Sequence, residues 1–231
     1  MAPDRHKLPR RSLWGVNAAN FFQAEMVGVI LPILSAFLKE AKWRYNAIGV
    51  APAAAGLGTV LFQAPAGWLT DKLTCRRTLF AAMALATRLC FALIPLVPRT
   101  APVVDSLLFL SGATQSFFGP LLGALTLGLA GHAHLNRVMG MNQSWNHAGN
   151  IVAALVAMGL VATLGLTSIF YSVGACSILA GASVLLIRER DLNEHVATGL
   201  TGDAGEGSNS WTYLLKNRTV RVLFLSILCF T

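Results

Sequence analysis

The chain has 231 residues, 55% of them hydrophobic and only 12% charged. A soluble domain carries about 25% charged residues, so this composition excludes an ordinary soluble protein and favours one that lies in a membrane. The net charge of +8 comes from Lys and Arg residues dispersed among short polar stretches, without a basic patch interleaved with aromatic residues, which also argues against a nucleic-acid-binding protein.

Six apolar stretches, each about 20 residues or more in length, predict six transmembrane helices. They cover residues 13–38, 47–69, 78–97, 103–130, 138–164 and 166–187. The first stretch is longer than the apolar core of a secretory signal and leads into further stretches, so we expect it to be retained as a helix. The predicted fold class is therefore all-α, a polytopic membrane protein built as a six-helix transmembrane bundle.

Polar stretches frame this bundle of residues 13–187. Residues 1–12 are basic, residues 188–218 are polar with a middle rich in Gly, Asp and Ser, and residues 219–231 are again apolar. We expect a cytoplasmic N-terminus at 1–12 and a flexible cytoplasmic linker at 188–218. The apolar residues 219–231 predict the start of a seventh transmembrane helix, which the sequence cuts off at Thr231.

The distribution of Lys and Arg predicts how the chain is oriented. Thirteen of these residues lie in segments that are cytoplasmic if the N-terminus is inside, and four lie in the loops on the other side. The positive-inside rule therefore places both ends of the six-helix unit in the cytoplasm, and we expect a multi-pass protein of the cell (inner) membrane. The first outer loop, with Lys39, Lys42 and Arg44, runs against this count.

The first predicted helix carries polar side chains at bilayer depth. Placing an ionised carboxylate such as Glu25 near the middle of a helix costs about 3 kcal/mol, which favours a functional role over a decorative one. A proton-binding group is one such role, and a carboxyl group hydrogen-bonded to another helix is the structural alternative. Asn17 and Asn20 lie on the flank of the same helix, where they either line a cavity or hydrogen-bond to a neighbouring helix.

A short charged turn, residues 67–77, connects the second and third apolar stretches. Gly67 and Asp71 are four residues apart and share a helix face, where the glycine would let another helix approach. Asp71 would meet a basic side chain or the positive end of a helix, and Lys72 follows it directly. Arg76 and Arg77 would reach the anionic inner leaflet. A generic positive-inside turn explains the two arginines but not the pairing of Gly67 with Asp71.

Arg88 is the one basic residue inside a predicted span. At the middle of the third helix it must snorkel, meet water or pair with an acid, and Glu25 is the acid at a comparable depth. In the fourth span Pro120 would kink the helix, and Gln115 is a polar residue of that span. Glycines of this span would allow close helix packing. These are Gly112, Gly119, Gly123 and Gly128.

A row of polar side chains marks the fifth predicted helix. Asn142, Asn146 and Asn150 are spaced four residues apart, and Gln143 and His147 form a parallel row. So many amide and imidazole groups are too polar for lipid, so we expect them to line an aqueous or solute-filled cavity. Interhelical packing is the alternative. Trp145, within the same row, either packs or stacks on a ligand.

No motif for a cofactor or for enzymatic catalysis is present in the sequence. Its four cysteines are isolated, and His132 and His134 form too small a set for a metal site, so we expect them in a loop. The sequence also lacks a phosphate-binding loop and a hydrolase motif. We therefore predict no enzyme activity, no cofactor and no metal.

The turn 67–77 resembles the signature of the major facilitator superfamily, Gly-x-x-x-Asp-Arg/Lys-x-Gly-x-Arg/Lys, which lies between the second and third helices. Gly67, Asp71, Lys72 and Arg76 occupy its defining positions, and Thr74 stands in place of its second glycine. This resemblance implies the N-terminal half of a twelve-helix secondary transporter that works by alternating access. The charged turn would then help to hold the cytoplasmic gate.

The resemblance also implies roles for individual residues and partners. Glu25 is similar to the mid-membrane acid of proton-coupled multidrug efflux members, and Gln115 is similar to a glutamine of the family's fourth helix. The implied partners are a small solute, protons or another coupling ion, the lipid bilayer, and a second six-helix half or partner chain. The alternative function is a membrane scaffold or receptor subunit that uses half of the transporter fold without transporting.

Overall fold

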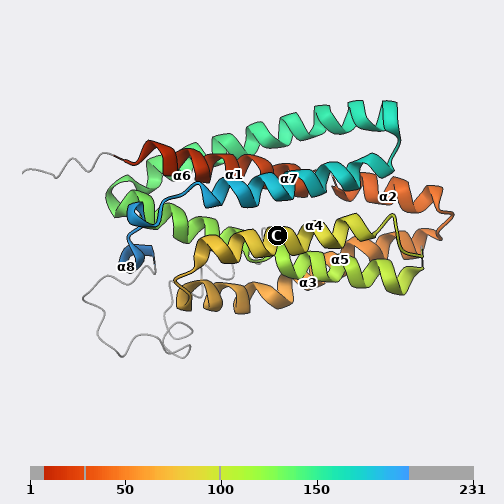
Figure 1. Ribbon diagram of the computed structural model, residues 1–231. Coiled ribbons are helices and arrows are strands. Elements are labelled where there is room, and N and C mark those ends of the chain that lie inside the picture. Colours follow the sequence, from red (N-terminus) through yellow and green to blue (C-terminus); the bar gives the residue numbers. More distant parts are fainter. Residues whose placement is uncertain (1–7, 29, 99, 198–231) are drawn as a thin grey trace, which may run out of the picture. The chain divides into compact units, whose positions relative to one another are not determined.

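The computed structural model describes residues 8–28, 30–98 and 100–197, without the side chains of residues 25–28, 31, 32 and 195. The chain divides into two units, residues 1–198 and 199–231, and the described residues all belong to the first. The predicted seventh helix and most of the predicted linker therefore lie outside the described residues. Figure 1 shows that the regular structure of the described part is helical.

Seven helices of eleven residues or more form the described part, followed by two short ones. They are α1 (Arg10–Gly28), α2 (Ile30–Glu40), α3 (Tyr45–Lys72), α4 (Arg76–Leu93), α5 (Ala101–Gln115), α6 (Phe118–Leu164), α7 (Thr167–Leu185), the 3-10 helix η1 (Glu189–Asp191) and α8 (Glu194–Ala197). α1 packs between α6 and α7, α4 packs between α5 and α7, and α3 packs along α5. The helices thus pack into one continuous bundle, with α7 joining the α1–α6 side to the α3–α4–α5 side.

Three helical stretches of the described residues are long and apolar enough to cross a membrane: 45–72, 101–164 and 167–185. The predicted span 13–38 is divided between α1 and α2, and the predicted span 78–97 overlaps α4, which begins two residues earlier and ends four residues earlier. Large apolar side chains such as Leu155 and Met158 are exposed along the helices, as expected for surfaces that face lipid. The described part is therefore an all-helical membrane protein, and the count of six spans stays a prediction.

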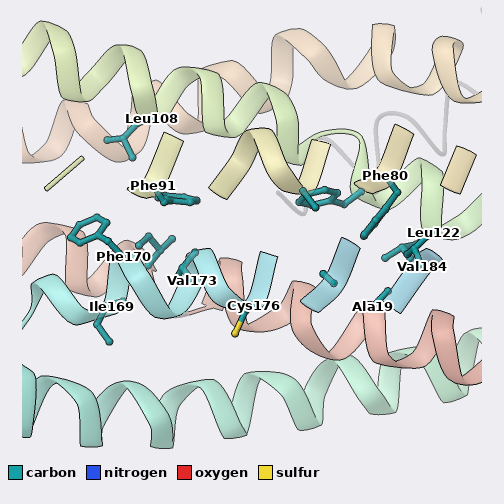
Figure 2. Close-up of a cluster of buried hydrophobic side chains, with 14 of the residues drawn as sticks. Ala19, Phe80, Phe91, Leu108, Leu122, Ile169, Phe170, Val173, Cys176 and Val184 are labelled. Carbon is teal, nitrogen blue, oxygen red and sulfur yellow. The ribbon is translucent and has the colours of Figure 1, made fainter. Parts of the chain in front are cut away.

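A cluster of aromatic and aliphatic side chains fills the centre of the bundle. Figure 2 shows Phe80 and Phe91 of α4 with Phe170 and Val184 of α7, and all four are fully buried or nearly so. Phe37 of α2 meets Phe170 edge to face with ring centroids 4.8 Å apart. Edge-to-face contact is a favourable geometry for such rings, so it fixes α2 against α7.

Where two backbones come closest, the contact is made at a glycine. A Cβ atom added at Gly58 of α3 would clash with the carbonyl of Phe109, and one at Gly112 of α5 would clash with the carbonyl of Ala55. Lipid provides no hydrophobic drive for helices to associate, so such close backbone contact is what holds α3 against α5. The packing role predicted for Gly112 is confirmed.

Pro120 and Gly131 shape the predicted fourth and fifth helices. Proline lacks the N–H that would bond to Ser116, and the helix is interrupted at residues 116–117, between α5 and α6. Gly131 adopts φ 61° and ψ 173°, and there α6 folds back on itself into two arms, residues 118–130 and 132–164 (Figure 1). The prediction that His132 and His134 lie in a loop is wrong, because the second helical arm begins directly after Gly131 and includes both residues.

Replacing Gly131 with alanine should lower the free energy of unfolding by about 2 kcal/mol, because the observed φ and ψ are accessible essentially to glycine alone. Gly140→Ala is the matched control on the second arm, since Gly140 is helical and a Cβ there would meet no atom within 4 Å. Unfolding in detergent, followed by circular dichroism, measures both variants. Equal stability of the two would show that the bend does not depend on the glycine conformation.

Candidate functional site

A polar cavity of about 430 Å³ lies where α1 meets the two arms of α6. Its lining residues come from α1 and from both arms of α6. They are Asn20, Gln23, Gly119, Leu122, Gly123, Thr126, Met139, Asn142, Gln143 and Asn146. A volume of this size is within the range of pockets that hold small molecules, about 300–1,000 Å³. We call it the amide cavity, since five of its lining residues carry a side-chain amide.

The bend at Gly131 creates this cavity by bringing the two arms of α6 face to face. Gly119, Gly123 and Thr126 follow one another at helical spacing on the first arm, and Asn142 and Asn146 do so on the second. A Cβ atom at either glycine would meet nothing within 4 Å, so small residues on the first arm leave this space open. The cavity is thus a product of helix periodicity on both arms.

Hydrogen bonds hold the asparagines of the cavity in place. The Asn142 Nδ2 donates to the Thr126 Oγ1 across the two arms of α6 at 2.8 Å, and the Thr126 hydroxyl donates to the Leu122 carbonyl at 2.6 Å. The Asn146 Nδ2 donates to the backbone carbonyl of Asn20 at 3.3 Å, which ties α6 to α1. The polar row therefore both packs the helices and lines the cavity.

Four of the predicted cavity residues line the amide cavity: Asn20, Asn142, Gln143 and Asn146. The other four are placed elsewhere. Asn17 is buried on α1, Asn150 donates to Asn146, His147 is exposed, and Gln115 lines a separate cavity of about 190 Å³ beside α2, α3 and α5.

Two polar lining residues, Gln23 and Thr126, were not predicted from the sequence. Gln23 lies three residues after Asn20, so the same helical spacing that marked the asparagines could have identified it. Thr126 carried no such signal, because it follows two glycines in an apolar stretch and its role depends on Asn142 of the other arm.

Trp145 packs against α1. Its ring lies edge to face with Trp14, with centroids 5.4 Å apart, and near Phe21 at 6.2 Å. A Cβ atom at Gly149, one turn further along α6, would clash with the carbonyl of Phe21. Of the two roles considered for Trp145, the structure shows packing.

Glu25 lies in α1, and its side chain is outside the described residues. Arg88 on α4 is half-buried, and its Nη1 donates to the carbonyl of Gly174 on α7 at 3.5 Å. α7 packs against both α1 and α4, so Arg88 is directed at the helix that separates it from α1. The pairing of Arg88 with Glu25 stays a prediction.

The charged turn connects α3 to α4. Asp71 and Lys72 are exposed, and the Lys72 Nζ lies 4.2 Å from the centroid of the Trp68 ring, a cation–π distance. No atom lies within 4 Å of a Cβ built at Gly67, so none of the described helices approaches this glycine as the sequence suggested.

The expectation that Arg76 reaches the inner leaflet is wrong, because its side chain is buried in the protein, whereas Arg77 is partly exposed and for it the expectation stays a prediction. The Arg76 side chain is fully buried; its Nε donates to the Thr70 carbonyl at 3.1 Å and its Nη1 pairs with Glu194. Arg77 pairs with Glu189 at 2.9 Å and also donates to the carbonyl of Leu185 at 3.1 Å. Buried guanidinium groups require such partners.

Both acids belong to residues 188–197, which we call the post-α7 segment. This segment also contacts the start of α1, where the Ser12 Oγ donates to Asp191 at 2.5 Å. At the bend of α6, the backbone N–H of Asn193 donates to the Gly128 carbonyl at 3.0 Å. The segment therefore connects the start of α1, the turn 67–77 and the α6 bend at one end of the bundle.

Comparisons with known proteins agree on one family. The profile described as Major Facilitator Superfamily matches residues 13–231. The chain is 27% identical over 227 residues to a protein of Mycobacterium tuberculosis named as an uncharacterized MFS-type transporter, covering 96% of this chain and 54% of that protein. It is also 27% identical over 165 residues to the multidrug resistance protein MdtG of Dickeya zeae, covering 69% of this chain and 38% of that protein.

A second MdtG, from a Rahnella species, is 28% identical over 149 residues, or 62% of this chain and 35% of that protein. The chain thus spans about half the length, or less, of these curated relatives. The family and the names of these relatives describe transporters rather than enzymes.

Proposed function

Because the chain belongs to the major facilitator superfamily, we propose that it forms the solute-binding N-terminal half of a secondary active transporter that works by alternating access. The single observation that carries this proposal is the amide cavity, which the two arms of α6 build together with α1 inside apolar helices. Polar groups at such depth are costly unless they face water, a solute or one another. A second six-helix half, on the same chain or a partner, would close the cavity from the other side.

Six membrane crossings with both ends in the cytoplasm form part of this proposal. The start of α1, the α3–α4 turn, the bend of α6 and the end of α7 all meet around the post-α7 segment at one end of the bundle. Segments that meet in this way lie on the same side of a membrane, which agrees with an even number of crossings and with the basic residues at this end.

Proton coupling through Glu25 and export of the solute are the finer parts of the proposal. Glu25 remains the coupling candidate because it is an acid placed by sequence near the middle of the first predicted span. Export is supported by the names of the two MdtG relatives. Arg88 is the second coupling candidate, since a half-buried guanidinium in a span requires a partner.

Flux in proteoliposomes tests the proposal, with the gene product expressed at its natural full length. An imposed pH gradient should drive uptake of at least one of two labelled probes, the uncharged phenyl glucoside or the cationic ethidium, and Glu25→Gln should reduce that uptake to the level without a gradient. Glu40→Gln is the matched control, because Glu40 is an exposed acid at the end of α2. Flux that persists unchanged in Glu25→Gln contradicts the coupling role, and the absence of gradient-driven flux of either probe contradicts transport.

A further inference from the structure

We propose that the amide cavity selects uncharged solutes that donate hydrogen bonds, and that Asn142 determines this preference. The inference rests on the proposed transport function and adds the chemical class of the solute. It is carried by an amide oxygen, the Asn142 Oδ1, which is buried and has no hydrogen-bond partner among the described residues, although Asn142 lines the cavity. An acceptor left without a partner in a buried site favours a ligand that supplies a donor.

The orientation of the Asn142 amide follows from its neighbours. The Thr126 hydroxyl has one proton, and that proton is used on the Leu122 carbonyl. The Thr126 Oγ1 can then only accept from Asn142, so the amide nitrogen must face Thr126 and the Oδ1 must face away from it. Asn142 is only 6% exposed, so its neighbours hold the side chain in this orientation.

The neighbouring asparagines are oriented by the same logic. Asn20 donates through its Nδ2 to the backbone carbonyl of Val16, and Asn146 donates to the carbonyl of Asn20. Carbonyls only accept, so the amide nitrogens of both residues must face the backbone. The Asn146 Oδ1 accepts a bond from Asn150 at 3.3 Å, while the Asn20 Oδ1 makes no hydrogen bond to the described side chains around it. The side-chain amides of the wall are therefore held in defined orientations, and the Asn142 Oδ1 is the buried oxygen among them that has no partner in the described part of the chain.

The absence of charge from the lining residues makes an uncharged solute the better fit. All ten lining residues are neutral, and their polar groups are amides and one hydroxyl. Moving a full charge from water into a site without a counter-charge costs several kcal/mol. Leu122 and Met139 add apolar surface, so the fitting ligand combines an apolar body with O–H or N–H groups.

Equilibrium dialysis of the full-length protein in nanodiscs tests this with two matched probes. Phenyl glucoside carries four hydroxyl donors, and its tetra-O-methyl derivative has the same skeleton and none. We expect saturable binding of the first and binding of the second weaker by about tenfold or more, the order expected when a buried acceptor loses its donor. Asn142→Leu should weaken phenyl glucoside by a similar factor, whereas Asn136→Leu, an exposed asparagine on the same arm, should leave it unchanged.

A second variant, Thr126→Val, tests the same inference if Asn142→Leu folds poorly. Thr126→Val has nearly the same shape but removes the acceptor that orients Asn142, so the amide can turn and present its N–H groups to the solute. The preference for the hydroxylated probe should then shrink several-fold. Equal binding of the two probes to the unaltered protein, or an unchanged preference in Thr126→Val, overturns the inference. Because binding is measured at equilibrium without a gradient, this outcome is independent of whether the protein transports.

Discussion

Replacing Glu194 with alanine should lower the free energy of unfolding by about 3 kcal/mol, because it leaves a buried cation without its counter-charge. The Arg76 side chain is 0% exposed, and its remaining partner would be the Thr70 carbonyl. Among the described residues its Nη2 has no hydrogen-bond partner, so Arg76 has no further bond there to replace the lost ion pair. The post-α7 segment would also lose its tie to the turn between α3 and α4.

Glu189→Ala is the matched control in the same segment. Glu189 pairs with Arg77, but its side chain is 89% exposed, whereas that of Glu194 is 40% exposed. An exposed pair contributes about 0.5 kcal/mol, so this variant should unfold nearly as the unaltered protein does. Unfolding in mixed detergent micelles with increasing dodecyl sulfate, followed by circular dichroism, compares the two.

The double variant Arg76→Met/Glu194→Leu separates a charge effect from simple loss of packing. Replacing both partners of a buried pair with apolar side chains of similar volume is commonly neutral or stabilising, so most of the lost stability should return. A double variant as unstable as Glu194→Ala would mean that the geometry of the segment, and not the unpaired Arg76 charge, accounts for the loss.

These contacts mark a limit of what the sequence predicts about the charged turn. The spacing of Gly67, Asp71, Lys72 and Arg76 was sufficient to identify the family. It gave no sign of the acids that neutralise the arginines, since Glu194 is 118 residues from Arg76 along the chain. Pairing over such a distance depends on how α7 returns the chain to the turn, which no local pattern encodes.

The sequence predicted only part of the amide cavity, again because contacts between distant parts of the chain decide which residues line it. Period-3.6 spacing correctly placed Asn142 and Asn146 on a shared face of a helix, and that face lines the cavity. The same pattern included His147 and Asn150, which do not line it, because helix spacing does not state which part of a face the neighbouring helix covers. The opposite wall, with Thr126, depends on the bend at Gly131, whose φ and ψ the sequence alone did not reveal.

The glycines also show that a sequence pattern does not by itself predict where two helices pack. Gly112 was predicted to permit close helix approach and does so, whereas Gly67 was predicted to and meets no described helix. Gly58 was not singled out, although its backbone is the one that Phe109 approaches. A glycine in a span therefore indicates that close approach is permitted, and the partner helix decides where it occurs.

Gly58→Ala should destabilise the bundle by about 3 kcal/mol, at the upper end of the range for an overpacked site. The added methyl group would clash with the backbone carbonyl of Phe109, and a backbone group in the middle of a helix has no alternative rotamer to adopt. Relief requires that α3 and α5 separate, which would weaken the contact between Gly112 and Ala55 and the hydrogen bond from Thr59 to the Gly112 carbonyl at 3.2 Å.

Gly56→Ala tests the same substitution two residues earlier on α3. Gly56 is exposed and a Cβ there would meet no atom within 4 Å, so the higher helix propensity of alanine should leave the protein as stable or more stable by about 0.5 kcal/mol. The difference between the two variants, measured by the same detergent unfolding, isolates the α3–α5 contact from helix propensity. If Gly58→Ala matches Gly56→Ala, then α3 does not depend on close contact with α5 for its place in the bundle.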